Sequence, residues 1–171
     1  MAQALEFFFD GEADAAVRGL WRRLDDAGVP SAHGRRRPRV TFAAAGVIPA
    51  ATRNALREDL RLLSIPSLWL STLAAIDGTL ALTAVVDTEL LAVHSAVHDV
   101  LAKRVKQPVA QYLPGSWMPH CVLARDLEPA HVIAGFSALY PVGSVKARIT
   151  EIAVVDTHSG ETDVVRDLEA S

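Results

Sequence analysis

Two segments of the sequence place side chains that could bind an anion or transfer a proton at matching positions in apolar strands. Arg39 and Thr41 lie two residues apart in the first segment, and His120 and Val122 do so in the second. Residues two apart share one face of a strand. If the two halves of the chain are related by a pseudo-twofold axis, these four side chains converge on one groove. The segments are 38–43 (PRVTFA) and 119–124 (PHCVLA).

These residue types suit contact with a phosphate group. Histidine is the side chain type whose ordinary pKa lies nearest neutrality, so His120 is a candidate to give or take a proton. The guanidinium of Arg39 stays protonated and offers a planar fork of donors, and the hydroxyl of Thr41 is a further donor. The basic run 35–37 (RRR) lies just before the first segment. The sequence therefore predicts an anion pocket that contains one acid–base group.

Strands and helices alternate along the chain and would position these segments. Asp77-Gly78 marks a tight hairpin between two strands. Sequential hairpins favour an α+β fold with antiparallel sheets over a doubly wound parallel fold. Expected strands are 4–9, 40–45, 66–75, 79–86, 121–124 and a long strand within 143–168 that returns after a turn at 158–160. Expected helices are 12–27, one that begins at Pro49, one from Asp87 to about Arg104, and 129–140.

In layout and in its second motif the chain resembles the two-histidine (2H) phosphoesterase superfamily, of the 2′-5′ RNA ligase and cyclic phosphodiesterase kind. The matching order is an opening strand, a helix, a first motif strand, a central hairpin and helix, and the lead-in 117–120 (WMPH) to the second motif. The resemblance implies a single bilobal α+β domain over residues 1–171. Two antiparallel sheets would face a central groove, with the helices packed outside.

The resemblance also implies roles for the motif residues. In that superfamily two histidines act as general acid and base on a 2′,3′-cyclic or 2′-5′ phosphodiester, and motif threonines bind the phosphate. His120 and Thr41 would then be catalytic, and Arg39 and Arg37 would bind substrate. Neither a metal nor a cofactor is implied.

The sequence departs from the superfamily pattern at two positions. Arg39 stands where the first motif has histidine, and Val122 stands where the second has threonine. Loss of one acid–base group typically costs about 10²–10⁴ in rate. We therefore expect phosphate binding to be retained and catalysis to be weak or lost.

Three functional hypotheses follow. The first is a protein that binds the cyclic or 2′-linked phosphate of an RNA end or small nucleotide, with weak hydrolysis at most. The second is a non-catalytic module that binds a protein or an unrelated ligand through the same groove. The third is an active enzyme that recruits another histidine, such as His33. A groove on which Arg39, Thr41 and His120 converge would favour the first.

Other features narrow the class of protein. The net charge of −3 gives no global attraction for a polyanion. Cys121 is the only cysteine, so an internal disulfide and a cysteine-rich metal site are excluded. The sequence has neither a signal-peptide pattern nor an apolar run that could span a membrane, which predicts a cytoplasmic protein.

His94 and His98 have the i, i+4 spacing of a helical zinc pair. The helper glutamate of the HExxH motif is missing between them. We therefore expect them to be helix-edge histidines with structural roles.

Overall fold

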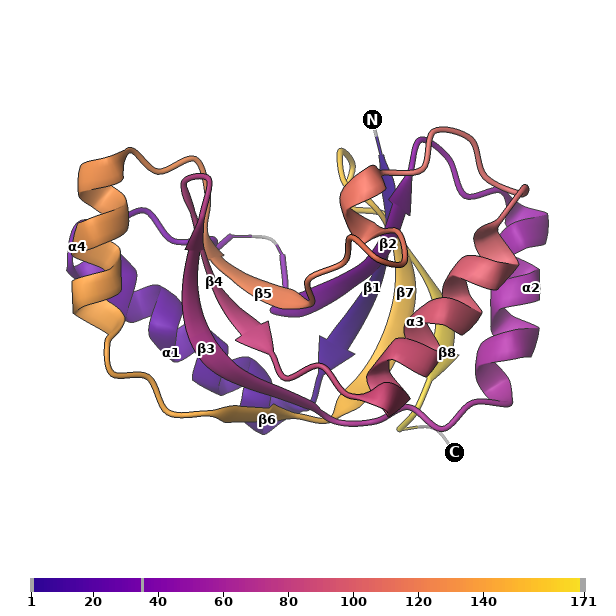
Figure 1. Cartoon of the computed structure of the whole chain (residues 1–171), viewed down its shortest axis with the longest axis horizontal. Coiled ribbons are helices and arrows are strands. Elements are labelled where there is room, and N and C mark those ends of the chain that lie inside the picture. The colour runs from indigo at the N-terminus through magenta and orange to yellow at the C-terminus, as the bar shows by residue number, and fades with distance from the viewer. Residues whose placement is uncertain (1, 35, 170–171) are drawn as a thin grey trace.

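The computed structural model describes residues 2–34 and 36–169, so Arg35 of the basic run lies outside the described residues. Figure 1 shows two lobes, each built on one sheet. The strand orders are β2-β1-β7-β8 and β5-β4-β3-β6, and all neighbouring strands are antiparallel. The strands are β1 (Gln3–Phe9), β2 (Arg39–Ala45), β3 (Leu68–Ile76), β4 (Thr79–Ala84), β5 (His120–Ala124), β6 (Val145–Ala147), β7 (Ile149–Asp156) and β8 (Thr162–Asp167).

Helices cover the outer faces of the two sheets, as predicted (Figure 1). They are α1 (Gly11–Asp26), α2 (Ala50–Arg61), α3 (Thr88–Leu101) and α4 (Pro129–Leu139), with a short 3₁₀ turn η1 (Ala110–Tyr112). The helices α2 and α3 pack against the first sheet, and α1 and α4 against the second. The predicted α+β class with antiparallel sheets is confirmed. None of the described helices is both long and apolar enough to cross a membrane.

Alternation along the central strands separates core from groove. On β1, Leu5 and Phe7 point to one face, whereas Glu6 and Phe8 point to the other. Phe7 stacks on Phe42 of β2 with ring centroids 3.5 Å apart, which places that face in the core. The same alternation on β2 leaves Arg39 and Thr41 on the groove side.

The last predicted strand is divided between the two lobes. β6 pairs with β3 in one sheet, and β7 pairs with β1 in the other. At the crossing, Arg148 N donates to Asp10 Oδ1 and Asp10 N donates to Arg148 O, both at 2.9 Å. The segment is extended throughout, so its sequence pattern gave no sign of the exchange between sheets.

The motif strands β2 and β5 are edge strands that face each other at the centre of the molecule, and two tryptophans hold them. Trp117 Nε1 donates to the carbonyl oxygen of Thr41 at 3.0 Å. Trp21 Nε1 donates to the carbonyl oxygen of Val122 at 3.2 Å. Trp117, in the lead-in to β5, thus holds β2, and Trp21, on α1, holds β5.

Candidate functional site

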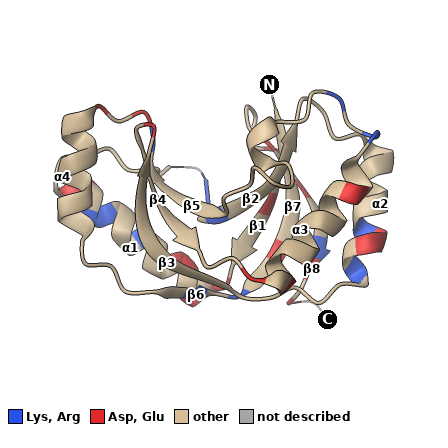
Figure 2. Ribbon diagram, viewed as in Figure 1, with Lys and Arg blue, Asp and Glu red and all other residues tan. Residues whose placement is uncertain are grey.

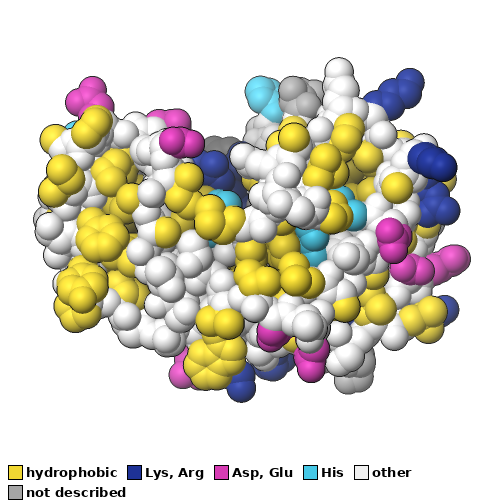
Figure 3. Space-filling view, viewed as in Figure 1, with side chains coloured by type: hydrophobic (Ala, Val, Ile, Leu, Met, Phe, Trp, Pro, Cys, Tyr) yellow, Lys and Arg dark blue, Asp and Glu magenta, His cyan; other side chains and the backbone are white. Residues whose placement is uncertain are grey.

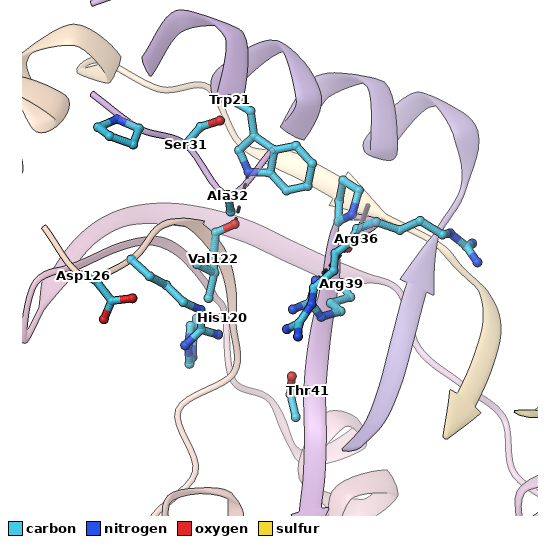
Figure 4. A pocket seen from close by; sticks show the side chains of 13 residues that line it. Trp21, Ser31, Ala32, Arg36, Arg39, Thr41, His120, Val122 and Asp126 are labelled. Atoms are coloured by element: carbon cyan, nitrogen blue, oxygen red, sulfur yellow. Dashed lines mark hydrogen bonds between the residues drawn. The ribbon is translucent and has the colours of Figure 1, made fainter. Parts of the chain in front are cut away.

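Arg39, Thr41, His120 and Val122 line one pocket of about 300 Å³ between β2 and β5 (Figure 4). We call it the phosphate pocket. In Figure 3 it opens in the hollow between the lobes, where basic and histidine side chains gather. The four motif positions therefore converge, as the two-residue period and the pseudo-twofold relation predict. The other lining residues are Trp21, Pro30, Ser31, Ala32, Arg36, Arg37, Pro38, Arg125 and Asp126.

His120 presents one ring nitrogen to the pocket. Its Nδ1 lies 2.7 Å from the carbonyl oxygen of Met118, and a carbonyl only accepts, so Nδ1 carries a proton. Nε2 has no hydrogen-bond partner among the described residues. Figure 4 shows His120 and Arg39 on opposite sides of the open space. In the neutral ring Nε2 is therefore a free base, and in the charged ring it is a free acid.

The first motif is tied to a carboxylate that we did not predict from the sequence. Glu6 Oε2 accepts a hydrogen bond from Thr41 Oγ1 at 2.7 Å, and Glu6 Oε1 lies 3.3 Å from Arg39 Nε. Glu6 is only 3% exposed. The available signal was a charge within the apolar run ALEFFF, because a buried carboxylate nearly always has a partner. The partners lie far along the chain, so the sequence did not identify them.

Arg36 and Arg37 of the basic run both contact the first lobe, and Arg36 stays exposed. Arg37 Nη1 lies 2.9 Å from Glu151 Oε1, and its guanidinium covers the ring of Phe8 at 4.1 Å from the centroid. Arg36 Nη2 donates to the carbonyl oxygen of Thr157. Their positive charge is thus held at one wall of the pocket.

Arg125 is a second residue that the sequence analysis missed. It directly follows β5, lines the phosphate pocket together with His120, and is exposed. Its guanidinium has no hydrogen-bond or ion-pair partner within the described residues, in contrast to Arg37 and Arg39. Its position immediately after the second motif strand was the signal that could have identified it. Arg125 is therefore a cation that an anionic ligand could recruit without breaking an existing ion pair.

The histidines of α3 have structural contacts. Nε2 of His94 donates to the carbonyl oxygen of Tyr112 at 2.8 Å, and Nε2 of His98 to that of Phe42 at 2.9 Å. The His94 ring stacks on Trp117 with centroids 3.9 Å apart. Burial, helped by the neighbouring His98, lowers the pKa of His94 to about 4. No group of three or more His, Cys, Asp or Glu residues that could hold a metal ion occurs within residues 2–34 and 36–169.

Cys121 and His33 lie outside the phosphate pocket. Cys121 is buried, and burial raises the pKa of its thiol to about 12, so it is not a nucleophile near neutral pH. His33 lies edge-on to Trp21 with ring centroids 6.1 Å apart, and it does not line the phosphate pocket. The structure therefore gives no support to His33 as a replacement for the missing histidine.

Comparisons with known proteins agree with this architecture. No protein-family model and no curated protein sequence matches the chain. Among solved structures, E. coli LigT complexed with 3′-AMP is similar with a TM-score of 0.62 and 15% identity, over 95% of this chain and 91% of that chain. The MHV ns2 PDE domain is similar with a TM-score of 0.57 and 11% identity, over 95% and 96%. Kluyveromyces marxianus Usb1 with uridine monophosphate is similar with a TM-score of 0.52 and 9% identity, over 96% and 97%.

These similarities cover almost the whole of this chain and of each matched chain. The chain therefore has the 2H phosphoesterase fold, as its layout and second motif predict.

Proposed function

We propose that this protein binds a 2′,3′-cyclic or 2′-5′-linked phosphodiester of an RNA end or small nucleotide in the phosphate pocket, and hydrolyses it slowly at most. The observation that carries the proposal is the convergence of His120 Nε2 with the guanidinium groups of Arg39 and Arg125 on one cavity. Two solved structures with the same fold hold nucleotides, namely 3′-AMP in LigT and uridine monophosphate in Usb1.

Both lobes would supply a cation to the phosphate, and the first lobe would also supply a hydroxyl. Arg125 and Arg39 would neutralise the phosphate, and the groove face of β2 would present Thr41 to a nonbridging oxygen. For the phosphate to use Thr41 and Arg39 fully, it must displace Glu6 from both donors. Val122 adds no donor on the other side, so binding is carried mainly by charge.

Proton transfer would rest on His120 alone. Hydrolysis of a cyclic diester needs a base for the attacking water and an acid for the leaving oxygen. Arg39 cannot be the base because it already carries its proton, and it cannot be the acid because arginine does not release that proton. Water or the substrate would complete the second transfer, and we expect a rate about 10²–10⁴ below that of a two-histidine site.

Turnover of a 2′,3′-cyclic nucleotide and of a 2′-5′-linked dinucleotide by the purified protein tests this function, with binding measured by calorimetry alongside. His120→Ala should abolish any hydrolysis. His131→Ala is the matched control, because His131 is an exposed histidine on α4 that does not line the phosphate pocket. Failure of the native protein to bind either ligand, or hydrolysis that survives in His120→Ala, would contradict the proposal.

A non-catalytic module is the second candidate, and the contact of Glu6 with Arg39 and Thr41 favours it. That contact fills two donors with an internal carboxylate. Absence of binding to every phosphodiester tested would support this candidate.

A further inference from the structure

A second pocket adjoins the phosphate pocket on the groove face of the first sheet. It has a volume of about 240 Å³, and we call it the hairpin pocket because the β7–β8 turn forms one side. It shares Arg36, Arg37 and Arg39 with the phosphate pocket. A ligand with its phosphate in the first pocket can therefore extend into the second. The remaining lining residues are Glu6, Phe8, Val155, Thr157, His158, Ser159, Gly160 and Thr162.

The guanidinium of Arg37 is held at the boundary of the two pockets. It lies over the Phe8 ring, with Cζ 4.1 Å from the ring centroid, and Nη1 lies 2.9 Å from Glu151 Oε1. The side chain of Arg37 is still 42% exposed. Its charge is already paired, so it is a poor phosphate clamp. An aromatic ring and a carboxylate thus hold a guanidinium whose side chain keeps an accessible surface.

We propose that Arg37 is a stacking platform for the nucleobase next to the bound phosphodiester, with that base lying in the hairpin pocket. This inference rests on the proposed function. Arginine planes stack on bases, and a plane fixed by an aromatic ring and a carboxylate loses little freedom when a base covers it. Hydroxyl and backbone groups of residues 157–160 line the same pocket and can meet the polar edge of the base.

A basic loop would be expected to contact phosphate through its charge, whereas Arg37 would contact a base through its planar group. A phosphate clamp needs only charge, which lysine also supplies. A stacking platform needs the planar group, which lysine lacks. Arg37→Lys therefore separates the two roles.

The test measures the affinity of 2′-5′-linked adenylyl adenosine and of two analogues, each lacking one adenine base, by calorimetry at neutral pH. Stacking of one base predicts that Arg37→Lys weakens the intact ligand about 5- to 30-fold. One of the two analogues should bind the native protein more weakly by a similar factor and be insensitive to Arg37→Lys. Arg61→Lys is the matched control, because Arg61 is the exposed last residue of α2 and lines neither pocket. Figure 2 shows α2 at the outer side of the molecule.

Glu151→Gln provides an independent arm. It releases Arg37 from its ion pair and keeps the charge of Arg37 in place. A freed phosphate clamp would bind all three ligands more tightly, whereas an untethered platform should bind more weakly only the two ligands that keep the stacking base.

Equal losses for all three ligands in Arg37→Lys, or no loss for any of them, would overturn the stacking role while the phosphate site stands. Absence of binding of all three ligands to the native protein would overturn the proposed function, and the inference with it.

Discussion

The carboxylate of Glu6 holds two donors of the first motif strand. Its two oxygens contact Arg39 Nε and Thr41 Oγ1, so it stands where the oxygens of a bound phosphate would compete for the same groups. The free energy of phosphate binding is then reduced by the cost of separating this carboxylate from its partners. Arg125 carries no such cost.

Glu6→Gln should raise the affinity for a 2′,3′-cyclic nucleotide, because the amide removes the competing charge and leaves Arg39 without a carboxylate partner. The same change should lower the free energy of unfolding by about 1–3 kcal/mol, since a largely buried guanidinium loses its ion pair and keeps only its bond to the carbonyl oxygen of Arg37. Calorimetric titration and urea denaturation measure the two effects. Glu58→Gln on the exposed face of α2 is the control, and an unchanged or reduced affinity in Glu6→Gln would contradict the competition.

Several of these residue contacts could be predicted from the sequence and others could not. The two-residue period of a strand placed Arg39 with Thr41. The match between segments 38–43 and 119–124 placed His120 opposite them. The partnership of Glu6 depends on strand order, because β1 lies beside β2 only in the folded sheet. A strand pattern states which residues share a face, and it does not state which strand is the neighbour.

At the scale of elements, the two tryptophans fix the motif strands. Trp117 links η1 and the lead-in of β5 to the backbone of β2, while Trp21 links α1 to the backbone of β5. The hydrophobic pattern predicted the strands, and Asp77-Gly78 predicted the hairpin between β3 and β4. The exchange of the chain between sheets at Arg148 could not be predicted, since both halves of that segment are extended.

Trp117→Phe should lower the free energy of unfolding by about 1 kcal/mol, because the carbonyl of Thr41 loses its indole donor. It should also weaken phosphodiester binding, because β2 is no longer held in place. Trp69→Phe is the control, since Trp69 is 48% exposed on β3. Equal effects in the two variants, measured by urea denaturation and titration, would contradict the role of Trp117 in holding β2 in place.

The packing of α3 against η1 should make stability depend on pH. The pKa of His94 is lowered to about 4 in the folded protein, whereas an unfolded histidine titrates near 6.5. Between these values the unfolded chain binds the proton more readily, so the free energy of unfolding should fall as the pH drops from about 6.5 to 4. The loss attributable to His94 is up to about 3 kcal/mol.

Urea denaturation of native protein and His94→Leu across this pH range checks that dependence. The native protein should lose more stability on acidification than the variant, which cannot bind the proton. Parallel dependences of the unfolding free energy on pH in the two proteins would contradict the assignment of this effect to His94.

At the scale of the whole molecule, the site depends on both lobes at once. One sheet supplies Arg39 and Thr41, and the other supplies His120 and, just beyond β5, Arg125. Neither sheet alone encloses the phosphate pocket. Arg39 and Val122, the two positions at which the sequence departs from the expected motif, lie in different lobes.

The double variant Arg39→His with Val122→Thr should therefore increase turnover of a 2′,3′-cyclic nucleotide. Restoring a second acid–base group is expected to raise the rate by about 10²-fold or more. Each single variant should gain less than the pair. A double variant that binds the nucleotide but turns it over no faster than the native protein would show that more than these two positions separates the site from a catalytic one.

The most direct test of the central claim is a crystal structure of the protein with a 2′,3′-cyclic nucleotide. The account predicts that the phosphate lies between β2 and β5, with an oxygen within hydrogen-bond distance of His120 Nε2 and another on Arg125. A nucleotide bound elsewhere, with the phosphate pocket empty, would contradict it.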